Sequence, residues 1–131
     1  MFVEYRWYHE RTLRPINLGG CAFLIGENMK RVFNKLVRDK IPEIIEANGE
    51  RAEIEILDDK RFLEQLHKKL LEEANEFLEE DSPEELADLM EVIYAIASLR
   101  GIDLEKVEKI RKAKAQKRGA FEKKIFLKET N

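Results

Sequence analysis

Five acidic residues in the middle of the chain have the types and spacing needed for chemistry. They form two groups in which carboxylates recur three positions apart: Glu72, Glu73 and Glu76, then Glu85 and Asp88. Residues three apart share one face of a helix, so each group can direct two carboxylates at the same ligand. Oxygen ligands alone favour hard divalent cations. The pattern therefore predicts a site for Mg²⁺, with Mn²⁺ able to substitute.

Helical periodicity turns four of these acids toward the core. At about 100° per residue, Glu73 falls inside the apolar arc of its segment, and Glu76 lies at the margin of that arc. Asp88 lies beside apolar positions of the next segment in the same way. We expect no lysine or arginine on these two faces beyond Arg61. Because unpaired carboxylates in an apolar setting are costly, a divalent cation between the helices would stabilise them.

Two interpretations without a metal stay open. A run of glutamates on a helix is most often a solvated acidic face. Glu85 also has a local explanation, because Ser82 followed three residues later by a glutamate is a capping box. Asp88 has no such explanation, since an aspartate in mid-helix among leucines and alanines has poor helix propensity.

Basic residues flank the acidic segment on both sides. The net charge is +4 over residues 1–40, −12 over residues 41–100 and +5 over residues 101–131. The bases that we expect to bind substrate phosphates are Lys35, Arg38, Lys40, Lys114, Lys117 and Arg118. The whole chain has a net charge of −3, which does not suit a nucleic-acid-binding surface.

Capping signals and apolar spacing divide the chain into four expected helices. Their expected ranges are 41–48, from a cap at Asp58 or Asp59 to about 80, from Pro83 to about 100, and from a cap at Asp103 to about 118. Residues 52–57 alternate between apolar and acidic, which fits one strand or an extended linker. We therefore predict an all-α helical bundle with at most one or two short peripheral strands.

The acidic motif resembles that of the MazG-like all-α nucleoside triphosphate pyrophosphohydrolases. The segment Asn34-Lys35-Leu36-Val37-Arg38-Asp39-Lys40-Ile41-Pro42 is similar to the opening of a subgroup of predicted house-cleaning enzymes, and Lys117-Arg118-Gly119-x-Phe121 is similar to its ending. The resemblance covers about residues 30–127. It implies hydrolysis of a nucleoside triphosphate to a monophosphate and pyrophosphate, with phosphoribosyl-ATP as an alternative substrate. A non-catalytic helical interaction module is the alternative of another class.

The resemblance also implies residue roles. Glu73, Glu76, Glu85 and Asp88 would hold Mg²⁺, while Glu72 and Glu73 would act in catalysis, with Glu72 helping to orient water. The eight residues between Glu76 and Glu85 are fewer than the family usually has. Glu85 is therefore the least certain ligand, and Glu91 is its possible replacement.

Length and composition indicate the domain organisation, the cellular compartment and the oligomeric state. The chain has 131 residues and one cysteine, which excludes an internal disulfide and suggests the cytoplasm. No apolar run is long enough to span a membrane. We expect residues 1–29 to be an appendage and residues 30–131 to be the pyrophosphohydrolase domain. The expected third helix is apolar nearly all round, so we predict a homodimer or a larger homo-oligomer.

Overall fold

The computed structural model describes residues 30–131, which are all-helical. The helices are α2 (Ile41–Ala47), α3 (Asp59–Glu80), α4 (Pro83–Arg100) and α5 (Leu104–Arg118). Their bounds agree with the expected ranges to within one residue, and the all-α prediction is confirmed. The predicted appendage, residues 1–29, lies outside the described part of the chain.

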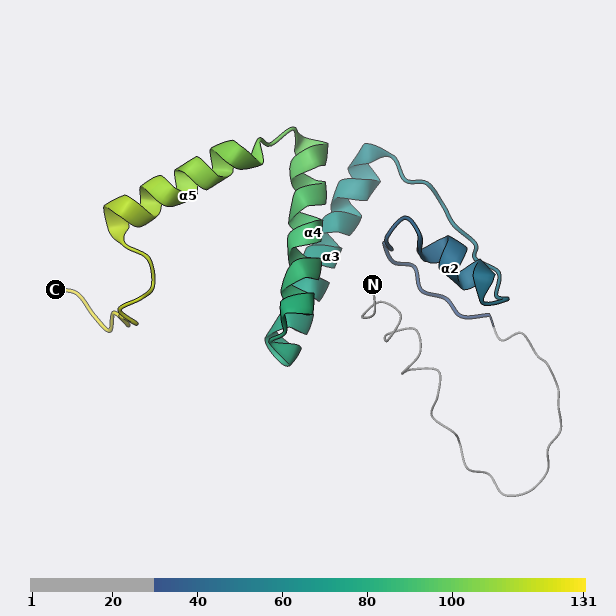
Figure 1. Cartoon of the computed structure of the whole chain (residues 1–131), viewed down its shortest axis with the longest axis horizontal. Helices are drawn as coiled ribbons and strands as arrows, with labels where there is room; N and C mark the ends of the chain where they lie inside the picture. The colour runs from purple at the N-terminus through teal and green to yellow at the C-terminus, as the bar shows by residue number, and fades with distance from the viewer. Residues whose placement is uncertain (1–29) are drawn as a thin grey trace, which may run out of the picture.

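Helices α3 and α4 form an antiparallel hairpin, which holds the buried core (Figure 1). Asp58 caps α3 by accepting a hydrogen bond from the backbone N–H of Arg61 at 2.8 Å. The turn between the helices is short: Asp81 ends α3 in the left-handed conformation, and Ser82 directly precedes α4. The buried apolar side chains are Leu66 of α3 and Val92 and Ala97 of α4.

The segment before α3 contacts the hairpin through ion pairs of Lys35 with Glu72 and of Arg38 with Asp88. Residues 30–40 are extended or turned, and α2 follows with Pro42 in its first turn, where a missing N–H costs nothing. Residues 52–57 form no strand, so the linker interpretation holds. Arg61 fastens this linker to the start of α3, because its Nη1 lies 2.5 Å from Glu55 Oε1.

Helix α5 leaves the end of α4 and points away from the α3–α4 hairpin (Figure 1). Gly101 makes this change of direction possible, since it ends α4 with a φ of 62°, which glycine adopts without strain. Asp103 then caps α5 by accepting from the N–H of Glu105 at 2.9 Å. None of the helices in residues 30–131 has the length and apolar character that crossing a membrane would require.

Candidate metal centre

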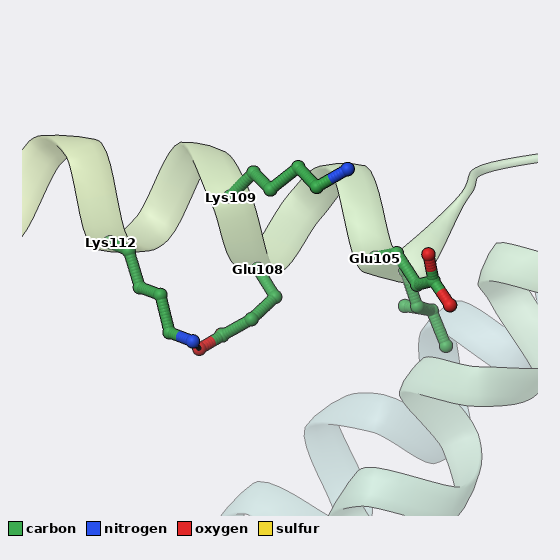
Figure 2. A pocket seen from close by; sticks show the side chains of 5 residues that line it. Glu105, Glu108, Lys109 and Lys112 are labelled. Atoms are coloured by element: carbon green, nitrogen blue, oxygen red, sulfur yellow. Dashed lines mark ion pairs between the residues drawn. The ribbon is translucent and has the colours of Figure 1, made fainter.

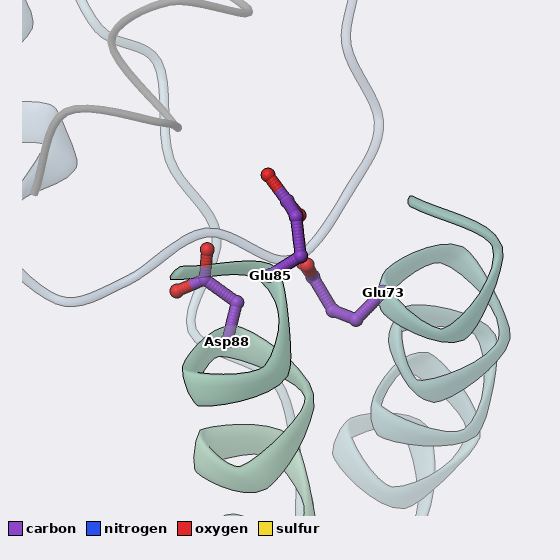
Figure 3. A group of neighbouring side chains, drawn as sticks. All are labelled: Glu73, Glu85 and Asp88. Carbon is purple, nitrogen blue, oxygen red and sulfur yellow. The ribbon is translucent and has the colours of Figure 1, made fainter. Parts of the chain in front are cut away.

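Three carboxylates meet between α3 and α4. Glu73 comes from α3, and Glu85 and Asp88 come from α4 (Figure 3). One oxygen of each lies within 4.8 Å of the others, so a single cation could contact all three. Glu73 is 3% exposed and Glu85 is 1% exposed, which is unusual for glutamates.

The start of α4 positions two of these carboxylates. The backbone N–H of Glu85 donates a hydrogen bond to Ser82 Oγ at 3.2 Å, as the capping box predicts. This cap places Glu85 in the first turn of α4, and Asp88 follows three residues later on the same face. Glu91, the possible replacement for Glu85, is exposed and lies outside the group. The short turn between the helices thus brings Glu85, the least certain of the predicted ligands, close to Glu73 and Asp88.

The other two predicted acids border the three-carboxylate group. Glu76 is partly buried, and its pKa is raised to about 7 by burial and then by the charges of Glu73, Glu72 and Glu85. Glu72 is partly exposed and contacts two lysines. The five predicted acids therefore form one electrostatic unit, which we call the acidic cluster.

A lysine that the sequence analysis excluded lies inside the acidic cluster. Lys69 is only 9% exposed, and its Nζ lies 2.7 Å from Glu73 Oε1 and 3.6 Å from Glu72 Oε1. The expectation of no base on this face of α3 was wrong. Lys69 precedes Glu73 by four residues, the spacing at which a lysine and a glutamate meet on a helix, so the signal was present in the sequence.

Two of the three predicted bases before α2 also reach the acidic cluster. The Arg38 guanidinium donates to the Asp88 carboxylate, and Lys35 Nζ lies 3.5 Å from Glu72 Oε1. These contacts join residues 50 and 37 positions apart. Lys40 instead lies exposed at the start of α2.

The three predicted bases on α5 do not join the acidic cluster of their own chain. Lys114, Lys117 and Arg118 are exposed, and α5 carries them away from the hairpin (Figure 1). Within one chain these three bases therefore lie apart from the acids, and their binding of substrate phosphates stays a prediction. The physical reason is the direction in which α5 leaves Gly101.

A surface hollow of about 440 Å³ lies on α5, away from the acidic cluster (Figure 2). Its lining residues are Leu104, Glu105, Glu108, Lys109 and Lys112. Glu108 pairs with Arg111 at 2.7 Å and with Lys112 at 3.6 Å, and the Arg111 hydrogen bond lowers the pKa of Glu108 to about 2. These are ion pairs of a solvated helix surface, which contribute little to stability.

The donor set of the acidic cluster suits a hard divalent cation. All three close ligands are carboxylates, and no histidine or cysteine belongs to the group. Three bases contact this cluster of five carboxyl groups, so acids outnumber bases among the described residues of the site. Comparisons of the chain with models of protein families, with curated proteins and with solved structures found no match.

Proposed function

We propose that the protein is a Mg²⁺-dependent pyrophosphohydrolase that converts a nucleoside triphosphate to a nucleoside monophosphate and pyrophosphate. One observation carries the proposal: a partly buried three-carboxylate group lies beside bases from another segment of the chain. Carboxylates suit the cation and bases suit phosphate oxygens, which together fit a metal-bound polyphosphate substrate. The resemblance of the acidic motif to MazG-like enzymes supports the same reaction.

The acids of the cluster would hold the cation. Glu73, Glu85 and Asp88 supply the nearest oxygens, and Glu76 is close enough that the charges of Glu73 and Glu85 add to burial in raising its pKa. When bound there, Mg²⁺ would screen the phosphate charge and acidify a water molecule for attack on the α-phosphorus. Mn²⁺ would serve as a substitute, because it accepts the same oxygen ligands.

The remaining residues have separate tasks in this proposal. Lys35 and Arg38 approach the rim of the cluster from residues 30–40 and would bind phosphate oxygens through charge-assisted hydrogen bonds. Glu72 is the most exposed acid of those that contact Lys69, and it would accept a hydrogen bond from the attacking water. The reaction needs no cysteine or serine nucleophile, and the single cysteine is compatible with the cytoplasm that we propose for the protein.

The test is pyrophosphate release from a panel of nucleoside triphosphates and phosphoribosyl-ATP, with and without Mg²⁺. We expect release only with Mg²⁺, and a loss of about 100-fold or more in Glu73→Gln and Asp88→Asn, as is usual when a charge-stabilising catalytic group is removed. Glu91→Gln is the matched control, because Glu91 is an exposed glutamate on α4 outside the cluster. This control should keep full activity.

Other results would favour other functions. Release of orthophosphate alone would indicate a different phosphohydrolase. Selective turnover of phosphoribosyl-ATP would identify the alternative substrate. If Glu73→Gln and Asp88→Asn left both metal binding and activity unchanged, the chain would be a helical interaction module whose acids form a charged surface.

A further inference from the structure

Two different cations can compete for the carboxylate of Asp88: a bound metal ion and the guanidinium of Arg38. It belongs to the three-carboxylate group, and it also accepts a hydrogen bond from Arg38. Its side chain is only 16% exposed, so the space around it is limited. A guanidinium and a divalent cation at the same carboxylate would also repel each other strongly at such short range.

Among the described residues, two cations contact the candidate metal ligands, and they differ in how easily they can leave. Lys69 is buried on the same helix as Glu73, so moving it would strand a buried charge. The Arg38 side chain is 45% exposed and lies on a non-helical segment that precedes α2. Moving the Arg38 side chain therefore takes a guanidinium that is already about half exposed further into water.

We propose that Arg38 is an exchangeable counter-cation. It neutralises Asp88 when no divalent cation is bound, and it is displaced when such a cation takes that carboxylate. The released guanidinium is then available to a phosphate group of the substrate. This inference rests on the proposed metal site, but it adds a coupling that the reaction itself does not require.

The coupling has a direct thermodynamic consequence. Breaking the contact between Arg38 and Asp88 is part of the free-energy cost of cation binding. Removing the Arg38 charge should therefore raise the affinity for the cation. By reciprocity, cation binding should raise the affinity of Arg38 for an anion, because the competing carboxylate is then occupied.

The first experiment is a Mn²⁺ titration followed by electron paramagnetic resonance on the full chain. We expect Arg38→Gln to bind Mn²⁺ about fivefold more tightly than the unmodified protein, at the lower end of usual coupling effects. Arg111→Gln is the matched control, since Arg111 also pairs with an acid but lies on α5. It should leave the affinity unchanged. Equal or weaker Mn²⁺ binding by Arg38→Gln would overturn the proposal.

The second experiment follows the Arg38 side chain directly. In ¹⁵N-labelled protein, the Arg38 Nε–H resonance, assigned by its loss in Arg38→Gln, should shift on Mg²⁺ addition. Asp88→Asn without Mg²⁺ should show a similarly released signal. An Arg38 resonance that stays unchanged at Mg²⁺ saturation would exclude the exchange. Neither measurement involves hydrolysis, so a protein that shows the exchange but cleaves no nucleotide would reject the proposed function alone.

Discussion

The acidic cluster brings five carboxyl groups together beside three bases of the described chain. Lys69 faces Glu73 and Glu72, Arg38 faces Asp88, and Lys35 faces Glu72. The ionised form of Glu76 is disfavoured, since burial and the charges around it raise its pKa to about 7. In the proposed function, a divalent cation at this site would relieve repulsion between carboxylates that the fold already contains.

The stability of the metal-free protein should depend on pH through Glu76. Its pKa is about 7 in the folded chain and 4.5 as the ordinary value, so the folded state binds the proton more tightly. Tighter proton binding by Glu76 stabilises the folded state. This contribution is fully present below pH 4.5 and is lost as the pH rises through 7. We expect the melting temperature in a chelator to fall over this range, and to fall less in Glu76→Gln. Glu79→Gln, an exposed change on the same helix, should retain the full dependence.

Lys69 should contribute to the stability of the fold mainly when no metal is bound. Replacing it with methionine leaves Glu73 buried without its nearest cation, which should lower the free energy of unfolding by about 3 kcal/mol. Mg²⁺ should restore part of this loss by taking over the neutralisation of Glu73. Urea denaturation with and without Mg²⁺ measures both effects. Lys68→Met is the control, since Lys68 is exposed on the same helix. Equal stability of the two variants would contradict the assigned role.

At the scale of elements, the start of α4 links folding to the site. The cap at Ser82 satisfies the backbone N–H of Glu85, and the same turn directs the Glu85 side chain into the cluster. Helix α3 packs against α4 and contributes Glu73 from its C-terminal half. The hairpin is thus both the buried core and the support of the candidate metal centre.

Loss of the α4 cap should affect both stability and metal binding. Ser82→Ala leaves the N–H of Glu85 without its side-chain acceptor, at a cost of about 1 kcal/mol. We also expect weaker Mn²⁺ binding, because the first turn of α4 holds Glu85. Urea denaturation and a Mn²⁺ titration test the two effects. Ser98→Ala, within the same helix, should change neither property noticeably. Unchanged Mn²⁺ affinity in Ser82→Ala would show that the cap does not position the ligand.

At the scale of the whole molecule, residues 30–131 leave much apolar surface exposed. The outer side of α4 carries Leu86, Met90, Ile93 and Tyr94, each more than 40% exposed. Beyond α5, the large apolar side chains of the final segment are still more exposed: Phe121, Ile125, Phe126 and Leu127. Monomers seldom tolerate such surfaces, which favours association with a second copy. Association could also bring the bases of one α5 toward the acids of another chain.

The active unit should therefore be at least a homodimer. Light scattering at micromolar concentration should give a mass of at least about twice the 15.5 kDa of one chain. A charge on the outer face of α4, as in Ile93→Glu, should shift the mass toward that of one chain. Leu71→Glu is the control, because Leu71 is an exposed apolar residue of α3. A single-chain mass with full activity on dilution would contradict this prediction.

Local signals in the sequence were enough to predict the helices and the inward-facing acids. Caps at Asp58, Ser82 and Asp103 determine where helices begin, because they satisfy backbone N–H groups within three residues. Helical periodicity predicted that Glu73 points toward the core, and it is buried. These features depend on residues a few positions apart, so the order of amino acids is sufficient to infer them.

Contacts between distant segments were decided by the tertiary structure. The pairing of Arg38 with Asp88 joins residues 50 positions apart, and no spacing rule predicts which carboxylate a given arginine will reach. The short α3–α4 turn brought Glu85 into the cluster, whereas the direction of α5 carried Lys117 and Arg118 away from it. In these cases the positions of whole helices and of the segments between them decide which side chains meet. Those positions depend on burial summed over many residues, to which each single residue contributes little.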